Sequence, residues 1–246
     1  MISKTQLSFV RSLHQKKFRQ MYGKFLVEGQ KLVNELLLSD WKVEFVFKTK
    51  EAQLVNLKRV ENVVEVTPDE LSQISTQAHP HLALAVVYIP AAETIYTENL
   101  TDGHYLLVDQ LSDPGNAGTI IRTAEWFGIE KVFFSEGSVE IFNPKVVAAA
   151  KGSLLRVKCY VTDLKKIIQA NPQLSVYGTF MKGESIYKTT LENKGFVVIG
   201  NEANGISPTV AKMVTTKLSI PSFGKAESLN AAIATGVVLS EFKRLA

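Results

Sequence analysis

Short, continuous runs of hydrophobic residues recur through the second half of the chain, and Phe196-Val-Val-Ile199 is one of them. A strand that is apolar at every position has to be covered on both faces, which is typical of a parallel sheet with helices on either side. We expect such strands at residues 105–109, 131–135, 155–160, 174–180, 196–200 and 217–221. Helical patterns fall between them at 117–127, 144–151, 163–170, 208–213 and 229–243. Gly128 is placed to end the first of these helices, and Asn143-Pro144 to begin the second. The sequence therefore predicts an α/β fold with a mostly parallel sheet and helices on both faces.

The first 92 residues predict a smaller α/β domain of their own. Thr67 is placed as a helix N-cap, with Pro68 at the first helical position and Glu70 completing a capping box. The expected strands are 25–29, 43–48, 62–66 and 82–89, and the expected helices are 3–20, 30–38, 51–58 and the one beginning at Thr67. The stretch from Pro90 to Gly103 is polar and weakly patterned, so we expect a linker there and a second domain over residues 103–246.

The composition is that of an ordinary globular protein. Hydrophobic residues make up 46% of the 246 positions, which argues against disorder. No apolar run approaches the roughly 18 residues that span a bilayer, and the basic N-terminus lacks the apolar segment of a secretory signal. The single cysteine, Cys159, excludes an internal disulfide and a thiolate metal cluster. We therefore expect a cytoplasmic enzyme with no membrane partner and no metal.

Basic residues are concentrated at the N-terminus, although the net charge of the whole chain is only +4. Glu28 is the only acidic residue among the first 31 positions, which hold the basic residues Lys4, Arg11, Lys16, Lys17, Arg19, Lys24 and Lys31. Positive charge of this kind suits a phosphate backbone. We take Lys16, Lys17 and Arg19 as candidate nucleic-acid contacts, and a solvated helix face that only aids solubility is the alternative.

Three polar loops follow expected strands in the second half, at the edge of the sheet where ligands bind in folds of this class. The first loop contains Asn116 and Gly118 and continues into a helix, on which Arg122 lies four residues after Gly118 and therefore on the same face. The second loop covers residues 200–207, and the third covers 220–230. Each loop alone has an ordinary explanation, such as an exposed arginine, a tight turn or a capped helix start.

Together, the order and spacing of the loops resemble the three motifs of the SpoU (TrmH-like) family of RNA 2′-O-ribose methyltransferases, in the SPOUT superfamily. The matching residues are Asn116-x-Gly118-x-x-x-Arg122-Thr123-Ala124 in the first motif, Ile199-Gly200-Asn201-Glu202 with Gly205-Ile206-Ser207 in the second, and Ile220-Pro221 with Ser228-Leu229-Asn230 in the third. The resemblance covers about residues 103–246, and Phe25-Leu-Val-Glu-Gly29 is similar to the substrate-binding domain often fused in front. One position departs from the pattern, because Ala203 stands where the family usually has glycine.

This resemblance implies S-adenosylmethionine as the cofactor, RNA as the substrate, a trefoil knot in the C-terminal catalytic domain and a homodimer. Ribosomal RNA is favoured over transfer RNA, because the first half looks like a substrate-binding domain. Backbone groups around Thr179, Gly200, Ile220 and Leu229 would hold the cofactor. By the same resemblance, Arg122 would hold the phosphate beside the target ribose and help activate its hydroxyl. Asn116 and Asn230 would orient the sugar or the arginine, Ser228 would hydrogen-bond nearby, and Glu202 would brace the site.

Two other functions fit the sequence. A non-catalytic RNA-binding or assembly module of the same fold would be free to lose Asn116, Arg122, Glu202 and Asn230, and all four are present. An α/β enzyme that acts on a small nucleotide would have no use for the basic N-terminus. Among the remaining residues, we expect His79-Pro-His81 to form a turn rather than a metal site, His104 to be exposed, and Trp126 to lie at least partly in the core.

Overall fold

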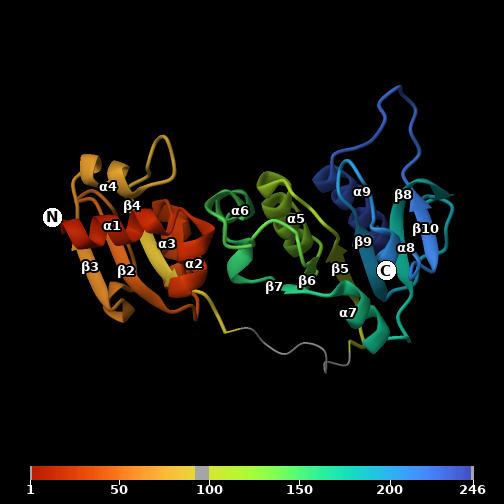
Figure 1. Cartoon of the computed structure of the whole chain (residues 1–246), viewed down its shortest axis with the longest axis horizontal. Helices are drawn as coiled ribbons and strands as arrows, with labels where there is room; N and C mark the ends of the chain where they lie inside the picture. Colours follow the sequence, from red (N-terminus) through yellow and green to blue (C-terminus); the bar gives the residue numbers. More distant parts are fainter. Residues whose placement is uncertain (1, 92–99, 245–246) are drawn as a thin grey trace. The chain divides into compact units, whose positions relative to one another are not determined.

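A computed structural model describes residues 2–91 and 100–244 of the chain (Figure 1). The chain forms two compact units. The first unit comprises Met1–Ala91 together with Glu140–Leu155, and the second comprises Ala92–Val139 together with Arg156–Ala246. Most of the linker expected between Pro90 and Gly103, residues 92–99, lies outside the described residues.

The sheet of the first unit has the strand order β1-β4-β2-β3. The strands are β1 (Lys24–Glu28), β2 (Val43–Lys48), β3 (Asn62–Glu65) and β4 (Ala83–Tyr88), and the helices are α1 (Lys4–Ser12), α2 (Lys16–Tyr22), α3 (Gln30–Leu37) and α4 (Pro68–Ile74). β4 pairs antiparallel with β1 and β2, whereas β2 and β3 run parallel. The capping box predicted at the start of α4 is confirmed: the Thr67 hydroxyl accepts the Glu70 amide, and the Glu70 carboxylate accepts the Thr67 amide.

The helix expected over residues 3–20 is interrupted, and Arg19 provides the reason. The chain turns between α1 and α2, and the Arg19 guanidinium donates to the carbonyl oxygens of Leu13 and His14 at 2.8 Å each. Carbonyls at the end of a helix lack intrahelical partners, and a cation there is favourable. A side chain of α2 therefore completes the end of α1, and the two segments fold as separate helices.

The helix expected over residues 51–58 does not form, and side chains of α3 instead bond two backbone amides of this segment. The Gln53 amide donates to Gln30 Oε1 at 2.7 Å, and the Val55 amide donates to Asn34 Oδ1 at 3.0 Å. Gln30 and Asn34 lie four residues apart on one face of α3, so they hold the neighbouring chain as a loop. Only a short 3-10 turn, η1 (Leu57–Arg59), follows.

Residues 140–155 belong to the first unit, although they fall in the second half of the sequence. They contain α6 (Pro144–Ala150) and the 3-10 turn η3 (Ser153–Leu155), and α6 packs against β1. The Phe142 ring lies 4.8 Å from that of Phe25 and 6.3 Å from that of Trp41, between ring centroids. Trp41 Nε1 also donates to the Leu155 carbonyl at 3.3 Å. An aromatic cluster thus anchors this excursion of the chain to the first unit.

The sheet of the second unit has the order β10-β8-β9-β5-β6-β7, and every neighbouring pair runs parallel. The strands are β5 (His104–Val108), β6 (Lys131–Ser135), β7 (Lys158–Thr162), β8 (Val176–Ser185), β9 (Gly195–Ile199) and β10 (Thr216–Ser219). The helices are α5 (Pro114–Trp126), α7 (Leu164–Ala170), α8 (Pro208–Ala211) and α9 (Ala231–Arg244). The predicted α/β class with a mostly parallel sheet is therefore confirmed (Figure 1).

Helices cover both faces of this sheet. On one face, Leu107 and Phe133 share a buried cluster with Ile167 of α7. On the other face, the ring of His104 meets that of Phe242 in α9, with centroids 4.7 Å apart. His104 is only 6% exposed, so the expectation that it lies at the surface was wrong: its Nε2 bonds the Glu192 carbonyl in the interior. α9 also packs against α5, which carries the first motif, and the third motif ends at Asn230, directly before α9.

Candidate active site

The ends of β5 and β9 are joined by a buried carboxylate. Asp109, which directly follows β5, is 2% exposed, and its Oδ2 accepts the Ser207 amide at 2.8 Å. Its own amide donates to the Ile199 carbonyl at 2.8 Å. Because β5 and β9 are parallel neighbours, the loops that leave them start side by side at one edge of the sheet. The first and second motifs lie in these loops.

The first motif begins with a well-defined helix start. Asp113 is the N-cap of α5 and accepts the Asn116 amide at 2.7 Å, and Pro114 occupies the first helical position. This arrangement is the one that satisfies the free amides of a helix N-terminus. It places Asn116 in the first turn of α5. The helix ends as predicted, with Gly128 just beyond it at a φ of +68°.

The second motif is a tight loop organised by Asn201. Asn201 Oδ1 accepts the amides of Ala203 and Asn204 at 2.9 and 3.1 Å, and its Nδ2 donates to the Gln110 carbonyl at 2.8 Å. Gly205 closes the loop with a φ of +66°, a conformation that glycine adopts without strain. Ala203 is not among the residues with positive φ, so alanine in place of the family's usual glycine costs the loop nothing.

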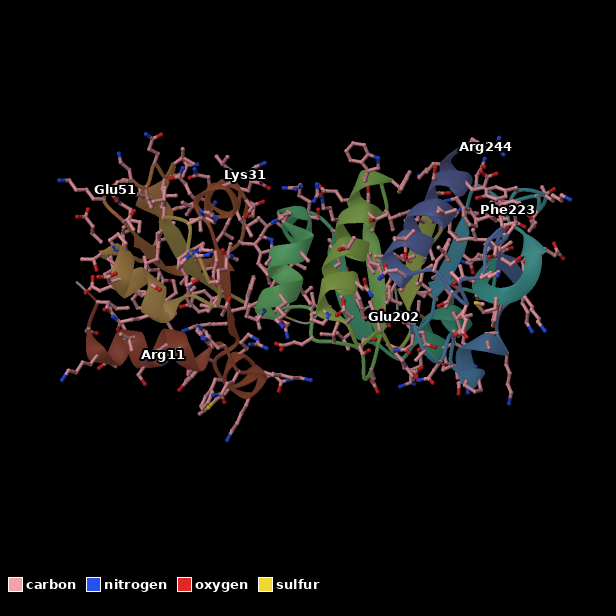
Figure 2. The ribbon with its side chains drawn as sticks, turned by 90° about the horizontal axis from the view of Figure 1, so that it is seen from above. Arg11, Lys31, Glu51, Glu202, Phe223 and Arg244 are labelled. Atoms are coloured by element: carbon pink, nitrogen blue, oxygen red, sulfur yellow. The ribbon has the colours of Figure 1, made fainter. Side chains whose placement is uncertain are left out.

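A chain of hydrogen bonds joins the three motifs. Asn230, of the third motif, donates from Nδ2 to Asn116 Oδ1 at 2.9 Å. Asn116, of the first motif, donates from Nδ2 to Glu202 Oε1 at 2.5 Å, and Glu202 belongs to the second motif. Figure 2 shows Glu202 in the second unit, below the ribbons of α5 and α9. The structure thus brings together three of the five residues expected to be catalytic.

The other two expected catalytic residues lie at the surface. Arg122 is exposed on α5, and Ser228 is exposed in the loop between β10 and α9. Neither side chain has a hydrogen-bond or ion-pair partner among the residues that the structure describes. An exposed cation without a protein partner is suited to bind an anionic group of a ligand.

Of the residues expected to hold the cofactor, Gly200 and Ile220 directly follow the parallel strands β9 and β10. The Thr179 hydroxyl donates to the Val198 carbonyl at 3.1 Å, which leaves its backbone as the group that could meet a ligand. A Cβ atom on Gly200 would lie 2.3 Å from the carbonyl carbon of Gly205, so only glycine fits there. Ile220 is half-buried, whereas Leu229 is 47% exposed.

The loop between Pro221 and Asn230 has backbone groups to offer. Every residue from 222 to 229 is exposed, and in this described stretch no backbone group bonds another backbone group. Figure 1 shows the loop in blue, rising away from β10 and α9. Phe223 is 95% exposed on it (Figure 2). Unpartnered backbone amides beside a glycine cradle fit a cofactor held by main-chain contacts, as expected for S-adenosylmethionine.

The basic residues of the N-terminus divide into two kinds. Lys16 and Lys17 are exposed on α2 and remain available to RNA. Arg19 is 2% exposed, and besides capping α1 it pairs with Glu140, its Nε donating to Oε1 at 3.0 Å. The prediction that Arg19 contacts RNA was therefore wrong, because its charge is buried and already neutralised within the first unit.

Sequence reasoning missed two residues that organise the site. Asp109 is a carboxylate directly at the end of an apolar strand, which is a position where ligands and loops are held. Asn201 begins Asn-Glu-Ala-Asn-Gly, and asparagine at the head of such a stretch often bonds the backbone two or three residues on. Both signals were present in the sequence. Trp126 was also misjudged, since it is 84% exposed rather than packed in the core.

Two further properties bear on the chemistry. In the described residues, no helix is long and apolar enough to cross a membrane. Among the same residues, His, Cys, Asp and Glu do not gather in any group of three that could hold a metal ion. His79 and His81 are both exposed.

Comparison with known proteins agrees with this geometry. A 23S rRNA (guanosine(2553)-2′-O)-methyltransferase from Bacillus subtilis is 29% identical over 93% of this chain and 92% of its own. A solved structure from Porphyromonas gingivalis, assigned to the TrmH family of RNA methyltransferases, is 38% identical over all of both chains, with a TM-score of 0.87. The SpoU methyltransferase AviRb of Streptomyces viridochromogenes, solved with S-adenosylmethionine, is 25% identical over 98% of each chain, with a TM-score of 0.87.

Two family models match the chain. Residues 4–85 match the MRM3-like substrate binding domain. Residues 103–240, more than half of the chain, match the SpoU rRNA methylase family. The resemblance seen in the three motifs is confirmed, and this chain belongs to the SpoU rRNA methylase family.

Proposed function

We propose that this protein transfers a methyl group from S-adenosylmethionine to the 2′-hydroxyl of a nucleotide in 23S ribosomal RNA. The observation that carries the proposal is the chain of hydrogen bonds from Asn230 through Asn116 to Glu202, which joins the three family motifs in one site. The substrate is inferred from the Bacillus subtilis relative, which acts on 23S rRNA. Transfer RNA remains the alternative substrate.

The cofactor site is assigned to backbone groups around Thr179, Gly200, Ile220 and Leu229. When bound, S-adenosylmethionine supplies an electrophilic methyl group that needs no further activation. The protein has to hold the cofactor, exclude water and bring the ribose hydroxyl into line. The glycine at position 200 supports this assignment, as do the backbone amides of residues 222–229, which bond no other backbone group among the described residues.

Arg122 is assigned to the RNA. Its guanidinium has five N–H donors in a plane and suits a phosphate group in two-point contact. With the phosphate held, the neighbouring 2′-hydroxyl is fixed in position, and the positive charge favours loss of its proton. Asn116 lies six residues before Arg122 on α5, and Glu202 lies in the loop after β9. Their side chains can orient the sugar.

Residues 1–92 are assigned to recognition of the RNA and residues 103–246 to catalysis. Exposed Lys16 and Lys17 on α2 support the first assignment, because phosphate contacts by lysine supply most non-specific affinity for nucleic acid. Residues 140–155 lie within the catalytic part of the sequence but fold with the first unit. The recognition unit is therefore built from both halves of the chain.

Further parts of the proposal concern assembly. We infer a homodimer, a trefoil knot in the C-terminal domain and a place in the cytoplasm. Support for the dimer comes from α5 and α9, which pack on each other and leave Trp126 and Ile233 exposed at 84% and 58%. Large exposed hydrophobic side chains often mark interaction surfaces. Sedimentation of the wild-type chain and of Trp126→Glu would test it, with a dimer expected for the first and a monomer for the second.

The activity is tested by transfer of tritiated methyl groups to RNA from a strain that lacks the gene. Ribosomal RNA from that strain should accept label, whereas ribosomal RNA from the parent strain should not, because its target is already methylated. Transfer RNA from either strain serves as the second substrate. Label in transfer RNA alone would overturn the choice of ribosomal RNA, and label in neither would overturn the proposed activity.

A further inference from the structure

The direction of the hydrogen bonds in the active site is set by a helix. A side-chain amide has one accepting oxygen and one donating NH2 group. Once a donor is known to bond the oxygen, the NH2 group must be the end that faces the other neighbour. Asn230 is the N-cap of α9, and its Oδ1 accepts the amides of Ala232 and Ile233 at 2.9 and 3.2 Å. Its Nδ2 is therefore the end that reaches Asn116, at 2.9 Å.

Asn116 is fixed by the same reasoning. Because its Oδ1 is engaged by Asn230, its Nδ2 must point to Glu202, which accepts at 2.5 Å. All the hydrogen bonds thus donate in one direction, from α9 through Asn116 to the carboxylate. The other oxygen of Glu202 has no partner among the described residues and is available to a ligand.

We propose that the N-terminus of α9 acts through Asn230 to set this direction, and so holds the negative charge of the site at Glu202. Asn230 is then a positioning residue, and Asn116 relays its orientation. The inference rests on the proposed function and deepens it. Methyl transfer then requires that the hydrogen bonds of the network donate toward Glu202, as well as that the three side chains lie in contact.

The donor-to-acceptor direction of the network can be reversed by moving the carboxylate from position 202 to position 230. In Asn230→Asp, the new carboxylate caps α9 as well as asparagine does but cannot donate to Asn116. Either a carboxylate oxygen of residue 230 then faces Asn116 Oδ1, so that two acceptors meet, or the Asn116 amide rotates. After rotation, Asn116 Oδ1 would face the Glu202 carboxylate, and two acceptors would meet there instead. Adding Glu202→Gln supplies a donor at the far end, so that a rotated Asn116 is satisfied on both sides.

The unfolding temperature reports whether the network has this direction. Asn230→Asp should lower it by about 3–8 °C, since an acceptor is left unpaired. Glu202→Gln alone keeps an accepting oxygen and should change it by less than about 2 °C. The double variant Asn230→Asp with Glu202→Gln should return to the wild-type value.

The turnover number reports whether the direction matters for catalysis. In the double variant the negative charge has moved from position 202 to position 230. We expect kcat to stay at least about tenfold below wild type although the unfolding temperature is restored. A purely structural role for the network would restore kcat together with stability.

Asn143→Asp is the matched control, because it makes the same change at the N-cap of α6. Asn143 Oδ1 accepts the Lys145 amide at 2.9 Å. Aspartate caps equally well, so the unfolding temperature should not fall.

Three results would each overturn the inference: an unchanged unfolding temperature in Asn230→Asp, no recovery in the double variant, or wild-type kcat in the double variant. The unfolding measurements need no RNA. They therefore separate a failure of this inference from a failure of the proposed methyltransferase activity, which the wild-type chain alone would reveal.

Discussion

Arg122 lies exposed on α5, six residues after Asn116, and its guanidinium has no protein partner within the described parts of the chain. Removing this side chain should therefore impair methyl transfer to the RNA and leave the fold intact. Arg122→Ala is expected to lower kcat by about 10²–10³-fold, the cost of removing one group that stabilises developing charge. Arg122→Lys should recover little, because an ammonium lacks the planar fork. Single-turnover methylation of RNA would measure both.

The control for this prediction is cofactor binding by calorimetry. The affinity for S-adenosylmethionine and the unfolding temperature should match wild type in Arg122→Ala. Full activity in this variant would show that another group holds the phosphate. A loss of affinity for S-adenosylmethionine would show that Arg122 contacts the cofactor and not the RNA.

Gly200 is the residue whose substitution should damage the cofactor site most directly. A Cβ there would lie 2.3 Å from the Gly205 carbonyl carbon and 2.4 Å from the Ile206 nitrogen, which are backbone atoms that cannot rotate away. Gly200→Ala should cost about 1–3 kcal/mol of stability through overpacking and weaken S-adenosylmethionine binding at least about tenfold, or 1.4 kcal/mol. Chemical denaturation and calorimetry would measure these effects.

Gly236→Ala provides the matched comparison within the same unit. Its Cβ would meet Thr123 at 3.9 Å, an ordinary contact between α9 and α5. In the interior of a helix, alanine is favoured over glycine by about 0.5–1 kcal/mol, so this variant should be at least as stable as wild type. Equal losses in both variants would mean that the clash at Gly200 is not the cause.

At the scale of elements, α2 carries two kinds of basic residue with different roles. Arg19 is buried against Glu140, whose side chain is 13% exposed, and also caps α1. Removing one partner of a buried ion pair is costly, so Arg19→Met should destabilise the protein by about 3–5 kcal/mol. Lys16→Met, on the same helix but exposed, should leave the free energy of unfolding within about 0.5 kcal/mol of wild type.

For RNA binding, we expect the exposed lysines of α2 to matter more than the buried Arg19. Changing Lys16 and Lys17 together should weaken binding to RNA and reduce the slope of log affinity against log salt by about 1 for each lysine. Filter binding at several salt concentrations would measure the slope. An unchanged slope would remove α2 from the RNA-binding surface.

The same scale shows what the sequence could predict. Elements whose ends carry their own local signals were found correctly: Thr67 with Glu70 at the start of α4, Asn143-Pro144 at the start of α6, and Gly128 after α5. Elements decided by distant contacts were not. The chain at 51–58 has a helical composition, but Gln30 and Asn34 of α3 bond two of its backbone amides, and no pattern within 51–58 reveals that.

Within the site, motif spacing was enough to gather Asn116, Glu202 and Asn230 in one candidate site, and the hydrogen bonds between them agree. It could not reveal the buried partner of Arg19, because Glu140 lies 121 positions away in the sequence. Charge counted along a chain says nothing about which charges are buried, so a basic cluster predicts an interface only for the members that remain exposed.

At the scale of the whole molecule, stability should depend on pH through His104. Burial lowers the pKa of this imidazole below its ordinary value of about 6.5, although its bond to the Glu192 carbonyl opposes the shift. The unfolded chain then binds more protons as the pH falls below 6.5, and the folded state loses stability. Thermal unfolding at pH 7.5 and 5.5 should show this loss, and His104→Gln should show less of it. An equal loss in both proteins would assign the pH dependence to other groups.

The two units carry different features of the whole chain. The first presents α2 and holds residues 140–155, and the second joins the three motifs. The most direct test is to map 2′-O-methylated nucleotides in the 23S ribosomal RNA of a strain that lacks the gene and then receives it back. We predict that one nucleotide loses its 2′-O-methyl group in the deletion strain, regains it with the wild-type gene, and does not regain it with Arg122→Ala. A methylation pattern that is the same in all of these strains would contradict the account.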